Sequence, residues 1–162
     1  GSFVQYRVHE QFAAGLVDND ATGKSTDVTG SMTINGTTVS DVTVTANLAA
    51  LKSDKEFRDN ALKSRGLETD KFPTAKFVAS GPVTLPNAPA KGATVKIDVP
   101  GSLTLHGVTK PITFPATIKV TDAEVTVDSA FKINRHDFGI TYGKGKVHDD
   151  VQLKVSSRVA RK

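Results

Sequence analysis

The sequence feature that most constrains the fold is a long alternation of apolar and polar side chains in the second half of the chain. From 94 to 105 the odd positions hold apolar residues and one glycine, and from 112 to 120 the even positions are apolar. A period of two is typical of a β-strand that buries one face. His106-Gly107, between the two runs, predicts a tight turn. Pro111 is expected to open the second strand, where its missing N–H leaves no ladder bond unmade.

Strands of this length favour a sheet that curls and closes. They are about twice as long as an ordinary strand of five or six residues, and closure hides the edges of such a sheet. Short connections favour antiparallel neighbours, so we predict a mainly β fold, an extended eight-stranded antiparallel barrel. A two-sheet sandwich is the alternative, because periodicity does not distinguish closure from face-to-face packing. The predicted strands cover residues 4–12, 28–34, 42–48, 75–79, 94–105, 111–120, 124–133 and 151–159.

Local signals place one helix and several turns between these strands. Ser53-x-x-Glu56 has the form of a capping box and predicts a helix between the third and fourth strands. Gly66 is expected to end that helix in a left-handed conformation. Asn35-Gly36 predicts a type I′ hairpin turn. The stretch 13–27 is rich in glycine, aspartate and asparagine, which predicts a long loop.

Composition bounds the classes of protein that the chain can belong to. Its 162 residues suffice for one domain, placed at 3–162, and Gly1-Ser2 resembles a cloning scar, which leaves a preceding signal peptide or anchor open. Cysteine is absent, which excludes disulfides and a thiolate nucleophile. The net charge of +4 agrees with a solvated basic surface or with attraction to an anionic lipid or ligand. Basic residues are not interleaved with aromatics, so no nucleic-acid partner is expected.

Motifs for catalysis, cofactors and metals are weak. Gly23-Lys24-Ser25 ends like a phosphate-binding loop, but that motif needs a glycine where Asp18 stands and a helix where alternation predicts a strand. The histidines, at 9, 106, 136 and 148, form no pair with metal-ligand spacing, and no G-x-S-x-G elbow occurs. We therefore expect a protein that is not an enzyme and has no cofactor and no metal. An enzyme with His106 as its acid or base is the alternative.

Three polar residues are candidates for contact with the head group of a ligand. His106 is in phase with the polar residues of its strand. This predicts either an exposed side chain beside the turn or a hydrogen-bond donor at the rim of the barrel. Arg58-Asp59 lies on the predicted helix. Its alternatives are pairing on the helix surface and an arginine that turns to the barrel mouth and meets a phosphate.

Four segments carry a specific combination of residues. They are 54–59 with its Arg-Asp pair, 71–77, 101–111 with Leu-Thr-Leu-His-Gly-Val-Thr-Lys-Pro, and 137–140. In composition, order and spacing they resemble the YceI-like polyisoprenoid-binding proteins. The resemblance implies a lipocalin-like barrel with an elongated apolar tunnel for a long-chain amphiphile. It also implies an extracytoplasmic location (periplasmic, secreted or membrane-anchored), and it puts Arg58, Asp59 and His106 at family motif positions.

From this resemblance and the apolar strand faces we expect a protein that binds, transports or sequesters a long-chain amphiphilic lipid. Family ligands include polyprenyl diphosphates, isoprenoid quinones and fatty amides. The alternatives are capture of lipophilic antibiotics and a structural or interaction domain with a solid-packed barrel. The expected partners are an apolar or amphiphilic small molecule and a membrane surface, for a monomer or homodimer. The expected tunnel wall consists of Phe77, Val95, Ile97, Val99, Leu103, Leu105, Phe114 and Phe131.

Overall fold

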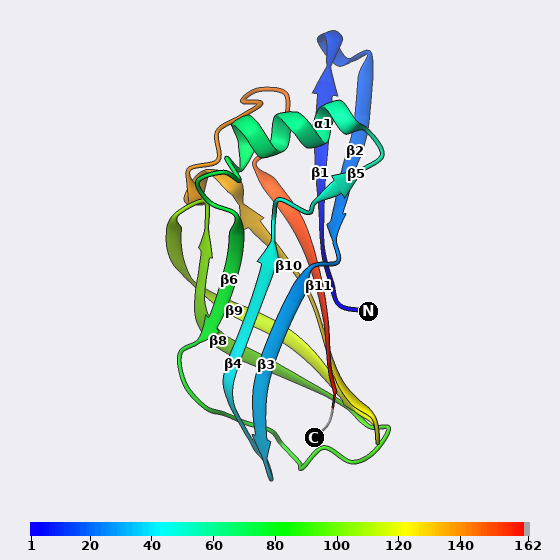
Figure 1. The fold of residues 1–162 in the computed structure, drawn as a ribbon, viewed down its shortest axis with the longest axis vertical. Coiled ribbons are helices and arrows are strands. Elements are labelled where there is room, and N and C mark those ends of the chain that lie inside the picture. Colours follow the sequence, from blue (N-terminus) through cyan, green and yellow to red (C-terminus); the bar gives the residue numbers. More distant parts are fainter. Residues whose placement is uncertain (161–162) are drawn as a thin grey trace.

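The computed structural model describes residues 1–160 and shows an antiparallel sheet that curls on itself (Figure 1), and the side chains buried inside the curl are mostly apolar. Residues 161–162, the end of the predicted domain 3–162, lie outside the described residues. The helical elements are η1 (Ala13–Gly15), α1 (Glu56–Ala61), the π-helical η2 (Leu62–Gly66) and η3 (Arg135–Phe138). The strands are β1 (Phe3–Phe12), β2 (Val17–Ser25), β3 (Val28–Asn35), β4 (Thr38–Asn47), β5 (Lys52–Ser53), β6 (Thr74–Ala79), β7 (Val83–Thr84), β8 (Thr94–Leu105), β9 (Val108–Val120), β10 (Glu124–Asn134) and β11 (Asp150–Ala160).

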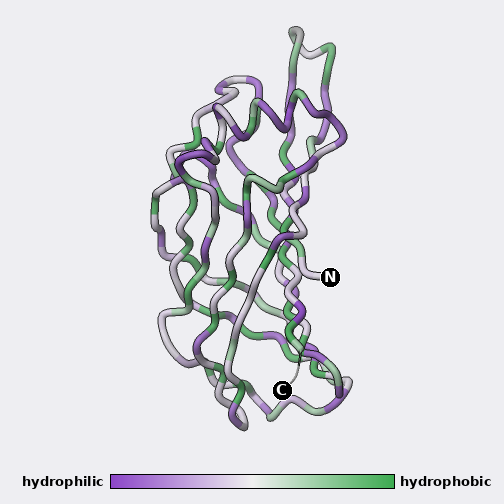
Figure 2. Tube along the Cα trace, viewed as in Figure 1, coloured by the Kyte–Doolittle hydropathy of each residue, from purple (hydrophilic) through white to green (hydrophobic). Residues whose placement is uncertain are grey.

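The strands follow one path through the sheet, in the order β3-β4-β6-β8-β9-β10-β11-β1-β2-β5, with β7 beside β4. Hydrophobic and hydrophilic residues alternate along these strands, as Figure 2 shows. At one end of the curl β3 packs against β11, where a Cβ on Gly30 would lie 2.5 Å from Ser157 Oγ. The edge strands β3 and β5 do not pair with each other within residues 1–160, so the sheet forms a curled half-barrel.

The predicted architecture is confirmed in its main features. All eight expected strands are present, and the α-helix lies between β4 and β6 as expected. One curled sheet surrounds the interior, so the sandwich alternative is wrong. The described part of the chain adds β2 and the two-residue strands β5 and β7, which the alternation did not predict.

Residues 17–25 form β2, which corrects the prediction of a long loop. This strand pairs with β1 over its whole length. Gly23 faces Tyr6, and a Cβ on Gly23 would lie 2.3 Å from the tyrosine ring, so this glycine makes room for an aromatic ring. Asp20 pairs with His9 on the neighbouring strand. Residues that are common in turns therefore serve here as cross-strand partners.

The central hairpin confirms the predicted tight turn at His106-Gly107. Both residues have positive φ, 51° and 72°, as a two-residue turn of type I′ requires. In the β3–β4 hairpin, in contrast, the central residues are Gly36 and Thr37, and of these two only Gly36 has positive φ, at 60°. This arrangement is that of type II′, so the expected type I′ turn is wrong at that position.

Pro111 lies inside β9, which begins at Val108, and does not open the strand as predicted. It stands opposite Ser102 of β8. The ladder between β9 and β10 starts only at Ala116, so the outer side of β9 is a free edge at Pro111. A proline is tolerated at such an edge because no ladder donor is required there.

The helix α1 begins two residues later than the capping box predicts. Lys55 is the N-cap and makes no side-chain capping bond, whereas Ser53 Oγ accepts from Lys55 N at 3.2 Å in a local turn. The Asp59 carboxylate reaches back and accepts from Ser53 N at 2.9 Å. The entry of the chain into the helix is therefore fixed by an aspartate inside the helix.

The end of the helical segment also differs from the prediction. Gly66 ends the π-helical turn without a positive φ, and Glu68 takes the left-handed conformation with φ 49°. A Cβ on Gly66 would lie 2.9 Å from Leu62 Cδ1. Gly66 thus allows close packing within the π-helical turn.

Candidate functional site

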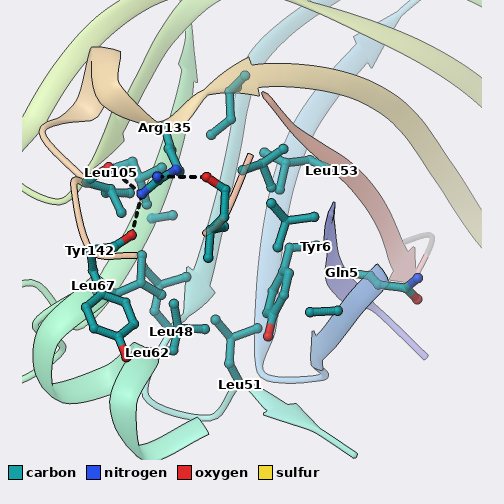
Figure 3. Close-up of a pocket in the computed structure, with 18 of the residues that line it drawn as sticks. Gln5, Tyr6, Leu48, Leu51, Leu62, Leu67, Leu105, Arg135, Tyr142 and Leu153 are labelled. Atoms are coloured by element: carbon teal, nitrogen blue, oxygen red, sulfur yellow. Dashed lines mark hydrogen bonds between the residues drawn. The ribbon is translucent and has the colours of Figure 1, made fainter. Parts of the chain in front are cut away.

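A large cavity lies inside the curl of the sheet, in the half of the molecule that carries α1. Its volume is about 890 Å³. The inner faces of β1, β4, β6, β8, β9, β10 and β11 form its wall, and α1, η2 and the loop that follows η3 border its entrance (Figure 3). Most of the lining side chains are apolar, including Leu48, Leu51 and Leu153. The cavity is therefore suited to an apolar occupant.

Three phenylalanine rings form the floor of this cavity. The ring centroids of Phe77 and Phe114 are 4.9 Å apart, and those of Phe114 and Phe131 are 5.4 Å apart. All three side chains line the cavity and also pack against a buried cluster that includes Ile118 and Val127. The interior is thus solid on one side of the rings and hollow on the other.

The eight predicted wall residues divide at this floor. Phe77, Leu103, Leu105, Phe114 and Phe131 line the cavity. Val95, Ile97 and Val99 do not line it, because they point into the packed cluster on the other side of the rings. Alternation along β8 predicts whether a side chain faces inward, but it does not predict on which side of the phenylalanine rings the side chain lies. The sequence therefore could not distinguish these two groups. Contact of the eight with a ligand stays a prediction.

Arg58 lines the cavity and also pairs with Asp54 beside its own helix, so both of its alternatives hold in part, and contact with a phosphate stays a prediction. It donates to Glu10 Oε1 at 2.7 Å and also binds the Asp54 carboxylate. The side chains of Arg58 and Glu10 are only 12% and 9% exposed. Because a buried charge is stable only when it is paired, this contact fixes α1 to β1 at the cavity wall.

Tyr6 lies close to this ion pair on the same wall. Burial raises the pKa of the Tyr6 phenol to about 12, and the positive charge of Arg58 opposes the rise. The phenol is therefore a neutral polar group at ordinary pH. Glu10 and Tyr6 were not predicted as site residues, because β1 gave only an alternation and Glu10 is separated from Arg58 by 48 positions.

Asp59 and His106 do not line the cavity. The Asp59 carboxylate is the acceptor for Ser53 N described above. His106 is 12% exposed at its side chain, so it is neither the exposed residue nor the open rim donor that its strand phase predicted. Its Nδ1 lies 3.0 Å from the Phe138 carbonyl oxygen, and its Nε2 lies 2.8 Å from Glu68 Oε2.

His106 therefore holds three segments together. Its ring faces two acceptor oxygens, so both hydrogen bonds form at once only when both ring nitrogens carry a proton. Lys71, and then His106, keep the pKa of the Glu68 carboxyl below its usual range. The ring also stacks edge-on with Phe72, with centroids 4.9 Å apart. Three of the four segments with the family resemblance meet at this contact, which gives them a structural role.

Arg135 is the largest feature that sequence reasoning missed. It is 4% exposed, and it donates to the backbone carbonyl oxygens of Ile140, Tyr142, Val147 and His148 at 2.5–3.1 Å. Figure 3 shows its guanidinium pointing to the loop beside Tyr142. This one side chain fixes the loop that follows η3 and thereby shapes the entrance. The only sequence signal was an arginine just before the Asp-Phe-Gly-Ile segment.

Basic side chains surround the entrance of the cavity. Lys55, Lys144 and Lys146 line it, are exposed, and have no acidic partner among the described residues. Arg65 lies over the ring of Tyr142, 5.0 Å from its centroid. The cavity thus combines an apolar interior with a cationic rim, which matches the two ends of an amphiphile that has an anionic head.

The described residues hold no group of three histidine, cysteine, aspartate or glutamate side chains placed to bind a metal. Among the helices of residues 1–160, none has the length and apolar character needed to cross a bilayer.

Comparison with known proteins gives a consistent result. The model of the YceI-like domain matches residues 2–159. A UPF0312 protein of Pseudomonas putida is 33% identical over 124 residues, which are 72% of this chain and 60% of that protein, so the chain spans about 60% of this relative's length. The protein YceI of Salmonella newport is 28% identical over 162 residues, which are 96% of this chain and 79% of that protein.

Two solved structures share the fold. A polyisoprenoid binding domain from Saccharophagus degradans, implicated in plant cell wall breakdown, superimposes with a TM-score of 0.77 at 16% identity, over 99% of this chain and 94% of that one. BcnA of Burkholderia cenocepacia superimposes with a TM-score of 0.72 at 21% identity, over 97% of this chain and 96% of that one.

Proposed function

Because this chain belongs to the family of YceI-like domains, we propose that it binds a long-chain amphiphilic lipid with the tail in the cavity and the head at the entrance. The observation that carries the proposal is the apolar cavity of about 890 Å³ above the three phenylalanine rings. The polyisoprenoid binding of the Saccharophagus domain, which has the same fold, supports a ligand of this class.

The size of the cavity fits a long tail. It is several times the volume of an apolar cavity of about 150 Å³ that binds benzene. Transfer of apolar groups out of water gives about 0.8 kcal/mol per buried CH₂, so a tail of some twenty carbons gains on the order of 16 kcal/mol before the costs of ordering. Affinity should therefore rise with tail length until the cavity is full.

The charges at the site favour an anionic head. Arg58 is compensated by Glu10 and Asp54 and offers little to a phosphate. Lys55, Lys144 and Lys146 are unpaired at the entrance and provide donors for a phosphate or carboxylate. A polyprenyl diphosphate meets both requirements, and an isoprenoid quinone meets the apolar one.

A protein of this kind carries its ligand through water or withholds it from other proteins. We propose transport or sequestration in an extracytoplasmic compartment, in keeping with the family resemblance of the four sequence segments. The hollow interior argues against the alternative of a structural domain with a solid-packed barrel. Capture of a lipophilic antibiotic would use the same cavity, and identification of the natural ligand separates it from a lipid.

The first experiment is solvent extraction of the protein purified from its native host, followed by mass spectrometry of the released molecules. The second is displacement of a fluorescent fatty acid by long-chain alcohols, fatty acids and polyprenyl phosphates. Leu105→Glu places a charge in the cavity and should reduce probe binding by at least about tenfold. Val78→Glu, on the outer face of β6, is the matched control.

Thermal unfolding of both variants shows whether Leu105→Glu remains folded. An empty extract together with no binding of any long-chain probe by the folded wild-type protein would refute the proposal.

A further inference from the structure

The entrance of the cavity carries a surface with an unusual number of exposed apolar side chains. Among the described residues, six large hydrophobic side chains are exposed, and five of them surround the entrance. We call these five the entrance patch: Phe12, Leu16, Val17, Phe57 and Tyr142. Leu16 is 88% exposed and Phe57 is 72% exposed. Large exposed apolar groups that gather in one place mark an interaction surface.

The shape of this surface is that of a projecting tip. The β1–β2 hairpin extends beyond α1 at the top of the molecule in Figure 1 and ends in η1. Phe12 and Val17 are cross-strand partners at the end of its ladder, and Leu16 precedes Val17. The loop after η3 braces the hairpin, since Gln11 N donates to the Lys146 carbonyl oxygen at 2.7 Å. The tip is therefore held in place beside the entrance.

Positive charge accompanies these apolar side chains. Lys55, Arg65, Lys144 and Lys146 have no acidic partner in the described part of the chain, and Arg65 lies over the Tyr142 ring. Some nearby carboxylates are paired: Asp18 contacts His9, and Asp54 shares the single charge of Arg58 with Glu10. Asp59 accepts from Ser53 N but has no basic partner among the described residues. Glu56 is the remaining exposed carboxylate on this side of α1. Acidic and basic side chains are therefore nearly balanced on this side of the molecule, and the basic side chains without an acidic partner lie at the cavity entrance beside the entrance patch.

Apolar tips flanked by cations fit one class of partner well. At a bilayer interface, apolar side chains enter the boundary between head groups and acyl chains while lysines and arginines attract anionic lipids. A second copy of the chain fits less well, because a symmetric dimer through this patch would bring two sets of unpaired lysines together.

We propose that the entrance patch docks on the surface of an anionic lipid bilayer. Docking places the cavity entrance against the membrane, so that an apolar ligand can pass between bilayer and cavity without crossing water. The docking itself depends on the surface side chains and not on an occupied cavity, so it can be tested separately from the proposed function.

The test is flotation of the full chain with vesicles of phosphatidylcholine and with vesicles that contain phosphatidylglycerol. The wild-type protein should bind the phosphatidylglycerol vesicles, and added salt should weaken the binding because surface charges are screened. Leu16→Asp should weaken it by at least about tenfold, since the variant loses an apolar anchor and adds a negative charge. Leu16→Ser should show a smaller loss of the same sign.

Two controls make the outcome decisive. Val78→Asp changes an exposed apolar residue far from the entrance patch and should bind vesicles like the wild-type protein. Leu16 does not line the cavity, so Leu16→Asp should keep the fatty-acid displacement measured without vesicles. Absence of wild-type binding to phosphatidylglycerol vesicles overturns the proposal. Vesicle binding by Leu16→Asp equal to that of the wild-type protein also overturns it. So does a wild-type dimer in light scattering that the Leu16→Asp substitution converts to a monomer, because the patch would then be a dimer interface.

Discussion

The cavity gives a quantitative prediction at a pair of small residues in its wall. Ala46 of β4 and Ala75 of β6 are cross-strand partners, and both line the cavity. Ala75→Phe would place a benzyl group in the hollow above the phenylalanine floor. Because this position borders empty space, the new ring should fill the cavity instead of overpacking the core.

The magnitude follows from the volume that the ring removes. Phenylalanine adds about six carbons to alanine, which is the space of about six ligand carbons at similar packing density. Each CH₂ excluded from the cavity costs about 0.8 kcal/mol, or about fourfold in affinity. The affinity for a tail that fills the wild-type cavity should thus fall by up to about 5 kcal/mol, and short tails should lose much less.

The assay is displacement of a fluorescent fatty acid by straight-chain fatty acids that differ by two carbons. With the wild-type protein, affinity should rise with length and then level off. With Ala75→Phe the plateau should begin at tails about six carbons shorter. Val78→Phe, which adds the same bulk to the outer face of β6, should leave the plateau unchanged.

The shape of the length series separates filling from damage to the fold. A destabilised protein would lose affinity for short and long tails alike, whereas a filled cavity changes only the long ones. An unshifted plateau in a folded Ala75→Phe protein would show that the tail does not occupy this cavity. An affinity independent of length in the wild-type protein would lead to the same conclusion.

Three further predictions concern single side chains around the cavity. Burial raises the folded-state pKa of Tyr6 from 10.0 to about 12, so as the pH rises the unfolded chain loses this proton before the folded protein does. The free energy of unfolding should therefore fall between pH 10 and pH 12. A titration followed by phenolate absorbance should show a late step near pH 12 that Tyr6→Phe removes. Arg135→Ala should lower the free energy of unfolding by about 3–5 kcal/mol in urea titration, because several buried carbonyl oxygens lose their donor; a loss below about 1 kcal/mol would contradict its role. Arg58→Met should destabilise by about 3–5 kcal/mol, because Glu10 is left as an unpaired buried charge, and adding Glu10→Gln should recover part of this loss.

Sequence was sufficient for the strands and insufficient for the level at which the interior changes from solid to hollow. Alternation fixes which side chains face inward, and this identified all eight wall candidates as inward-facing residues. The floor depends on where Phe77, Phe114 and Phe131 meet across β6, β9 and β10, which is a matter of register between strands. Periodicity within one strand excludes a slip of one residue, which would turn the apolar side chains outward, but it does not distinguish registers that differ by two residues.

The errors at β2 and at the helix have a common physical reason. Glycine, aspartate and serine favour turns and caps in isolation, but here their preferences yield to partners from distant segments. Gly23 leaves room for the ring of Tyr6, and Asp20 pairs with Arg7 and His9. The contact between Glu10 and Arg58 is likewise non-local. Such pairs are set by the tertiary fold, which a scan along the chain does not contain.

The layer of three rings has a consequence for the evolution of proteins with this architecture. The three rings limit the length of the ligand tail that the cavity can hold, because the strands continue well past Phe114 but the cavity ends at the rings. Replacing one ring by a smaller side chain would deepen the cavity, and a bulky side chain in the wall above the rings would make it shallower. Preference for longer or shorter guests can therefore drift by single substitutions while the outer shape of the molecule is conserved.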